Sequence, residues 1–180
     1  MSVQFAEFHQ ALRVAGFSHR QGGIFSKKEG KELYLWVSTD DHSTNGKVAI
    51  GCIFTKLVKK IYELTEKTSI PAHPSFPISW GPPAFLIDFN LPESVSDLEG
   101  AVQKLESILG RFTELDTVID CLLRGEELFS WNRDHVVAAG LALLGKCETL
   151  QEFCSRSAEV GPIREFLEAA LDDCAAHKIS

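Results

Sequence analysis

The sequence lacks the short motifs that mark most nucleotide-binding and hydrolytic enzymes. It contains no GxxxxGKS or GxxxxGKT phosphate loop, no GxGxxG turn, no HExxH helix, no EF-hand loop and no GxSxG elbow. Catalytic groups that assemble from distant parts of a chain leave no such motif, so an enzyme is not excluded on this ground. We nevertheless predict a protein that is not an enzyme, with no catalytic residues and no cofactor.

Long apolar runs, secretory features and metal-binding cysteine patterns are also missing. The longest strongly apolar stretch, Val136–Leu144, is far shorter than the roughly 20 residues of a membrane helix. Near the N-terminus, Glu7 is present and no early Lys or Arg precedes an apolar run, unlike in a secretory signal. The cysteines form no CxxC pair and no zinc-type spacing with histidine, and most lie in apolar runs. We therefore predict buried reduced thiols, no metal site and a cytoplasmic location; the five cysteines are Cys52, Cys121, Cys147, Cys154 and Cys174.

The charge of the chain is acidic and unevenly distributed. The 180 residues include 18 Lys and Arg and 25 Asp and Glu, which gives a net charge of −7. Residues 1–60 are net basic, and residues 61–180 carry the whole acidic excess. An acidic surface repels nucleic acid and attracts basic proteins, although helices with solvated Glu and Asp produce the same imbalance. The lysine clusters lack interleaved aromatic residues, which favours solvated surface over RNA contact; they are Lys27, Lys28 and Lys31, and Lys56, Lys59 and Lys60.

Four segments have the composition of β-strands, and the rest of the pattern is helical. Aromatic and β-branched residues predict strands over 23–26, 32–38, 47–54 and 84–90, with connections that favour an antiparallel meander. Apolar residues at helical spacing predict helices over 3–15 and 55–67, and further helices from residue 98 onward. Ser96, Thr113 and Asn132 are the expected helix caps. We predict an α+β fold with a meander sheet of about four strands, an α+β domain over 1–125 and a helical extension over 126–180.

Three places offer chemistry, and each has a structural alternative. Asp40, Asp41 and His42, with Asn45, offer a metal or proton-transfer site, or a polar turn whose side chains bond their own backbone. Asp134 and His135 offer an acid–base pair, or Asn132 caps a helix whose dipole the acid complements. The loop from Pro71 to Pro83 carries His73, Phe76 and Trp80, and it is either a binding element or a cover for one end of the sheet.

Two stretches of the chain have an order of elements known from one protein family. They are Phe8–Phe54, with Leu12, Gly16-Phe17 and Ile24-Phe25 leading into strands, and the segment from Asp97-Leu98-Glu99 to Leu115-Asp116-Thr117-Val118-Ile119. In this order the chain resembles a bacterial family designated domain of unknown function 4304. The resemblance covers about two thirds of the chain and departs from the family in the Pro71–Pro83 loop and after Trp131. The resemblance implies a similar α+β fold. It implies no activity and no site residues.

The sequence therefore favours an interaction protein of the bacterial immunity or antitoxin kind that covers a basic toxin. Acidic side chains would guide the encounter, and aromatic side chains would supply most of the affinity. A small enzyme or ligand-binding domain with a site near the Pro71–Pro83 loop is the first alternative, and a structural homodimer subunit is the second. The predicted partner-binding residues are Phe76, Trp80, Glu126, Glu127, Phe129, Trp131, Asp134, Asp172 and Asp173.

Overall fold

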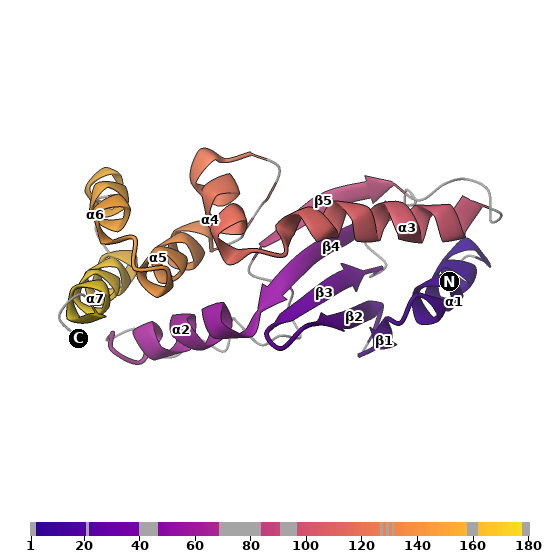
Figure 1. The fold of residues 1–180 in the computed structure, drawn as a ribbon, viewed down its shortest axis with the longest axis horizontal. Coiled ribbons are helices and arrows are strands. Elements are labelled where there is room, and N and C mark those ends of the chain that lie inside the picture. The colour runs from indigo at the N-terminus through magenta and orange to yellow at the C-terminus, as the bar shows by residue number, and fades with distance from the viewer. Residues whose placement is uncertain are drawn as a thin grey trace.

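A computed structural model gives the fold of the chain (Figure 1). It describes residues 3–20, 22–39, 47–68, 84–90, 97–126, 128, 130, 132–157 and 162–177. The molecule is elongated: a sheet covered by two helices occupies one half, and a cluster of helices occupies the other. The predicted α+β class, with helices concentrated in the C-terminal half, is confirmed.

The sheet is an antiparallel meander of five strands within the described residues. The strands lie in chain order, and each pairs with the next: β1 (Ser18–His19), β2 (Ile24–Glu29), β3 (Leu33–Ser38), β4 (Lys47–Phe54) and β5 (Ala84–Asn90). The last four are the predicted strands. The additional strand β1 is only two residues long, too short to show the alternation by which a strand is recognised in a sequence.

One face of the sheet forms the main core with the helices. Alternate residues of β3 point to this face, with Leu35 and Val37 both buried. Helix α1 (Val3–Val14) and helix α3 (Leu98–Leu109) pack against each other, and α3 also packs against β4. Figure 1 shows α3 lying across this face. On the opposite face, Trp36 is buried in a small separate cluster with Ile24 and Ile53.

Helix α2 (Thr55–Thr65) follows β4 without a gap and leads from the sheet to the helical half. There, α5 (Arg133–Leu143) is the central helix, and its residues from Val136 to Ala142 are all buried. It packs against α2 and against three further helices, which are α4 (Leu115–Arg124), α6 (Cys147–Arg156) and α7 (Pro162–His177).

Side chains of both halves belong to one continuous core. Phe25 of β2 and Phe166 of α7 are both fully buried members of the same cluster. Helix α4 ends at Gly125, which has a left-handed φ of 69°, at the predicted boundary between residues 1–125 and 126–180. That boundary stays a prediction.

The structure differs from two of the predicted helix caps, from Thr113 in the position of the cap and from Asn132 in the capping hydrogen bond. Glu114, and not Thr113, occupies the N-cap of α4, and the Thr113 hydroxyl instead donates to the carbonyl of Gly110 at 3.4 Å. Asn132 stands at the N-cap of α5 as predicted, but its side chain makes no capping hydrogen bond. Asp97 is the N-cap of α3, and Ser96 lies outside the described residues.

The prediction that all cysteines are reduced is wrong. Cys147 and Cys174 form a disulfide that joins α6 to α7 across 27 positions of sequence. Cys52 and Cys121 are buried free thiols, as predicted, and burial raises the pKa of Cys52 to about 12. Cys154 is free and half-buried. As for membranes, none of the helices in the described residues is both long and apolar enough to cross a bilayer.

Candidate functional site

More than half of the predicted site residues lie outside the described residues. This applies to the aromatic residues chosen as hot spots and to both loop sites proposed for chemistry. Those residues are Asp40, Asp41, His42, Asn45, His73, Phe76, Trp80, Glu127, Phe129 and Trp131.

The predicted acidic residues that the structure describes do not form one cluster by their recorded contacts. Glu126 is exposed at the end of α4 and pairs with Arg124 at 3.2 Å. Asp134 pairs with Arg133 at 3.6 Å. Asp172 is exposed on α7.

His135, the proposed partner of Asp134, packs its ring on a phenylalanine. Its ring centroid lies 4.6 Å from that of Phe166. Burial lowers the pKa of His135, and the charge of Asp134 only partly opposes this effect. His135 is therefore a half-buried side chain that packs against the core residue Phe166.

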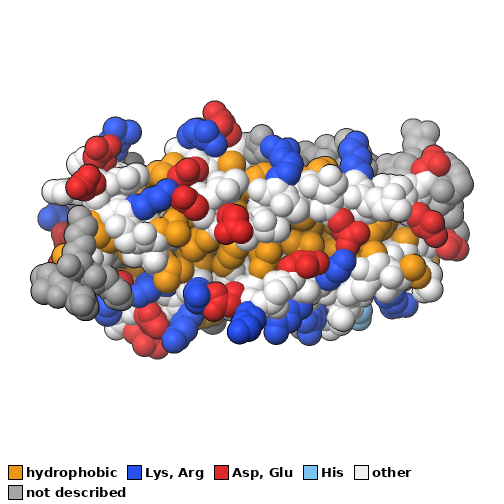
Figure 2. Space-filling model, in the orientation of Figure 1, with side chains coloured by type: hydrophobic (Ala, Val, Ile, Leu, Met, Phe, Trp, Pro, Cys, Tyr) orange, Lys and Arg blue, Asp and Glu red, His pale blue; other side chains and the backbone are white. Residues whose placement is uncertain are grey.

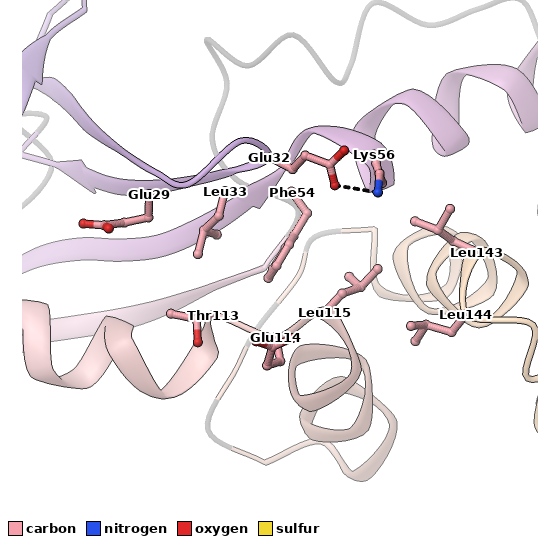
Figure 3. Close-up of a pocket in the computed structure, with 10 residues that line it drawn as sticks. All are labelled: Glu29, Glu32, Leu33, Phe54, Lys56, Thr113, Glu114, Leu115, Leu143 and Leu144. Carbon is pink, nitrogen blue, oxygen red and sulfur yellow. Dashed lines mark ion pairs between the residues drawn. The ribbon is translucent and has the colours of Figure 1, made fainter.

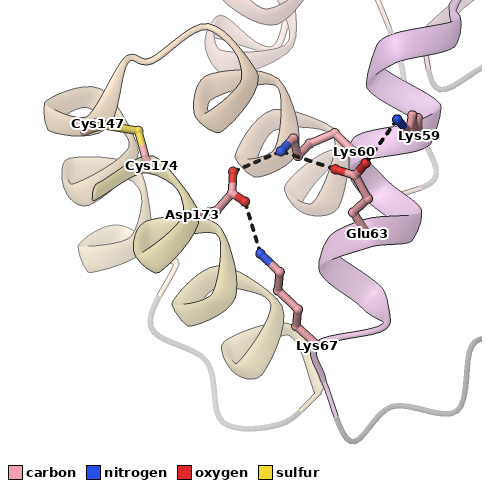
Figure 4. Close-up of polar contacts among 7 residues, drawn as sticks. All are labelled: Lys59, Lys60, Glu63, Lys67, Cys147, Asp173 and Cys174. Carbon is pink, nitrogen blue, oxygen red and sulfur yellow. Dashed lines mark hydrogen bonds and ion pairs between the residues drawn. A yellow bond between two sulfur atoms is a disulfide. The ribbon is translucent and has the colours of Figure 1, made fainter. Parts of the chain in front are cut away.

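Asp173 is engaged within the molecule. Its two carboxylate oxygens each accept a hydrogen bond at 3.0 Å, one from Lys60 and one from Lys67 (Figure 4). Burial raises the pKa of Asp173, but the two lysines outweigh this effect and hold it below its ordinary value. With only 10% of its side chain exposed, this carboxylate ties α7 to α2.

The structure reveals a different site, a groove of about 570 Å³ where the sheet meets the helical half (Figure 3). Four separate segments supply its 10 described lining residues, which are Glu29, Glu32 and Leu33, Phe54 and Lys56, Thr113, Glu114 and Leu115, and Leu143 and Leu144. Half of them are apolar. We call this site the junction groove. In Figure 2, apolar side chains run along the middle of this face between two rows of charged side chains.

The turn between β2 and β3 forms one wall of the junction groove. Gly30 has a φ of 64°, a left-handed conformation that suits glycine and lets the chain reverse between Glu29 and Leu33. The carbonyl of Glu32 accepts hydrogen bonds from the backbone amide of Thr55 at 2.9 Å and from its hydroxyl at 3.3 Å. These bonds attach the turn to the start of α2, next to Phe54 and Lys56.

The opposite wall comes from two helix ends. Glu114 has an extended conformation at the N-cap of α4, so Thr113 and Leu115 flank the point where the helix begins. Leu143 and Leu144 end α5, and Gly145 follows with a left-handed φ of 70° that turns the chain away. Both walls thus consist of residues fixed by the ends of regular elements.

The rim of the junction groove is acidic. It carries the carboxylates of Glu29, Glu32 and Glu114 and one ammonium group, that of Lys56. Lys56 pairs with Glu32 at 2.7 Å, so these two charges compensate each other.

The other two carboxylates on the rim are less well compensated. The Oε1 atom of Glu29 lies 3.6 Å from the Nζ atom of Lys27, which is closer, at 2.5 Å, to the Oε1 atom of Glu106. Glu114 is exposed and has no ion-pair partner in the part of the chain that the structure describes. The groove therefore offers an apolar floor beside net negative charge.

The chemistry of the lining suits binding. The 10 lining residues are leucine, phenylalanine, threonine, glutamate and lysine, and among them Glu32 faces Lys56 (Figure 3). In the described residues, no group of three or more His, Cys, Asp or Glu side chains is arranged to hold a metal ion.

Sequence reasoning missed this site because its residues are distant in the chain. Leu33, Phe54 and Leu115 fit the apolar patterns of a strand or helix, and that pattern does not distinguish a groove floor from a core. Glu114 lies next to the predicted cap Thr113, and its neighbours in the sequence do not indicate a groove.

No protein-family model matches the chain, and no curated protein or solved structure matches it. The resemblance to domain of unknown function 4304 therefore stays a prediction.

Proposed function

We propose that the protein is a non-enzymatic interaction module of the immunity or antitoxin kind, and that it docks a basic partner protein in the junction groove. The observation that carries the proposal is the combination of an apolar floor with an acidic rim in one groove. A partner segment with an apolar side chain beside a Lys or Arg matches both features. A basic toxin supplies such a segment.

The two parts of the groove would have different roles in binding. The apolar side chains of the floor, such as Phe54 and Leu115, would bury a partner side chain and supply affinity. The carboxylates of Glu29 and Glu114 would attract a cationic partner and fix its register. The acidic excess of residues 61–180 would add a long-range field of the same sign.

Site-directed photocrosslinking in the source cells tests the proposal. A photoreactive amino acid at the exposed groove residue Thr113, and another at Leu144, are expected to capture the same basic protein. The matched control is Thr149, an equally exposed threonine on α6 that lies outside the groove lining. It is expected to capture nothing specific.

The captured protein is then purified and assayed for toxicity. We expect it to inhibit growth when expressed alone, and co-expression of this chain to restore growth. Capture of the same protein at Thr149, or of an acidic or harmless protein at Thr113, would contradict the proposal.

A further inference from the structure

The disulfide lies between two clusters of ion pairs, each centred on the residue before a cysteine. Lys146 precedes Cys147 in the sequence. Asp173 precedes Cys174, and Figure 4 shows Asp173 with its lysine partners beside the disulfide. Lys146 contacts helix α4, whereas Asp173 contacts helix α2. These two helices begin on opposite walls of the junction groove.

On the α4 side, the disulfide is close in sequence to the groove lining. Leu144, which lines the groove, lies three positions before Cys147. The ammonium group of Lys146 donates to the carboxylates of Asp116 and Asp120, in the first two turns of α4. The same helix starts with the lining residues Glu114 and Leu115.

On the α2 side, the link runs through Asp173. Its pairs with Lys60 and Lys67 connect α7 to α2. That helix begins directly after Phe54, and its second residue, Lys56, pairs with Glu32 on the groove rim. A continuous series of contacts therefore connects the two groove walls, and the disulfide is its covalent member.

We propose that the Cys147–Cys174 disulfide is a redox-sensitive latch that holds the two walls of the junction groove in the arrangement that docks a partner. The inference rests on the proposed function, of which it is a regulatory feature. A cellular or added dithiol supplies the two electrons. In the first step, a thiolate of the reductant attacks the Sγ of Cys147, and Cys174 leaves as a thiolate that takes a proton. In the second step, the other thiol of the reductant displaces Cys147, which leaves as a thiol, and the reductant forms its own disulfide.

The two cysteine residues differ in burial in a way that suits this order of events. Cys147 is half-buried, and Cys174 is fully buried in the core. An incoming thiolate therefore reaches Cys147 first. The buried position of Cys174 keeps it near its partner, which favours closure again when the reductant is removed.

Other contacts also join the walls, because α5 packs directly against α2 and α4 in the core. The buried ion pair of Lys60 and Asp173, whose side chains are 11% and 10% exposed, likewise does not depend on the disulfide. The other ion pairs are weaker, because the side chains of Asp116, Asp120 and Lys67 are 54%, 50% and 52% exposed and solvent screens them. Reduction should therefore loosen the start of α4 and the end of α5 relative to α2 without separating them.

Hydrogen–deuterium exchange on the whole protein, with and without dithiothreitol, measures this loosening directly. We expect the amides of residues 115–120 and 141–147 to exchange about tenfold faster after reduction, as in a local opening, and those of β3 and β4 to be unchanged. The double variant Cys147→Ser/Cys174→Ser should match the reduced wild type. Cys154→Ser keeps the disulfide and should respond to reductant as the wild type does.

A labelled amphipathic peptide of leucine and lysine reports on docking in the same samples. We expect the oxidised protein to bind it and the reduced protein to bind it about tenfold more weakly. Unchanged exchange in residues 141–147 after confirmed reduction would overturn the latch. Faster exchange with no peptide binding in either state would instead count against the proposed function of the groove and leave the loosening established.

Discussion

The sheet half and the helical half of the molecule are held together in different ways. In the sheet half, backbone hydrogen bonds join consecutive strands, and an ion pair between Lys27 and Glu106, at 2.5 Å, connects β2 to the covering helix α3. In the helical half, a disulfide and the two ion pairs of Asp173 supplement packing around the buried helix α5. The difference indicates that the sheet half relies mainly on its backbone ladder, whereas the helical half adds side-chain links and a covalent bond to its packing.

The largest expected effect comes from truncating the shared core in each half. Phe25→Ala and Phe166→Ala each remove a fully buried ring, and each should lower the free energy of unfolding by about 3–5 kcal/mol. Because both rings belong to one continuous core, we expect urea denaturation to show a single transition in both variants. Two separate transitions would show that the halves unfold independently and would contradict the single core.

Removal of the disulfide should have the next largest effect on the free energy of unfolding. Among the described residues, the only disulfide lies in the helical half. Cys147→Ala/Cys174→Ala opens a loop closed across 27 positions, and we expect a loss of about 2–4 kcal/mol in the free energy of unfolding. Cys154→Ala is the control and should retain most of the stability. A double variant as stable as the wild type would remove the contrast between the two halves.

Helix packing inside the helical half offers a smaller test. A Cβ on Gly140 of α5 would overlap the side chain of Ile119 of α4, so Gly140→Ala should cost about 1–3 kcal/mol in unfolding free energy. Gly110→Ala is the matched control, because nothing lies within 4 Å of its added Cβ. We expect the control to be neutral or slightly stabilising in the same urea titration.

Each half also contains a histidine whose pKa is lowered in the folded protein. For His9 the causes are burial, then the charges of Arg13 and His19; for His135 the cause is burial. Below the ordinary value of 6.5, the unfolded chain binds more protons than the folded one, so stability should fall as pH decreases from 6.5 toward the folded pKa values. Well above 6.5, where the unfolded histidines are also neutral, these groups add no pH dependence.

Thermal unfolding at pH 5, 6 and 7 measures this smallest effect. His9→Asn and His135→Asn should each reduce the slope of the melting temperature against pH, and the double variant should reduce this slope further. A slope that is the same in all variants would assign the acid sensitivity to other groups.

Most of the fold was predictable because its elements follow regular patterns. Strands 47–54 and 84–90 match the structure in both bounds, and the helix over 3–15 ends within one residue of α1 because Gly16 stops it. The disulfide was not predictable: Cys147 and Cys174 lie far apart in sequence, and Cys174 belongs to an apolar helical stripe that is equally consistent with a free thiol.

The site was less predictable than the fold. Glu126, Asp134 and Asp173 are among the predicted partner-binding residues, but each pairs with a basic residue of the chain itself. The junction groove depends on tertiary contacts that bring Leu33 and Leu115 together from segments about half a chain apart. A single sequence contains no local signal for that proximity.

Two matched carboxylates allow the most direct test of the groove. Glu114 and Glu148 are both exposed at the start of a 10-residue helix, and neither has an ion-pair partner among the described residues, but only Glu114 lines the junction groove. The affinity of the leucine–lysine peptide for Glu114→Lys and for Glu148→Lys is measured by calorimetry at low salt. The account predicts a loss of about tenfold or more for Glu114→Lys and little change for Glu148→Lys. Equal losses in both variants, or none in either, would contradict docking in the groove.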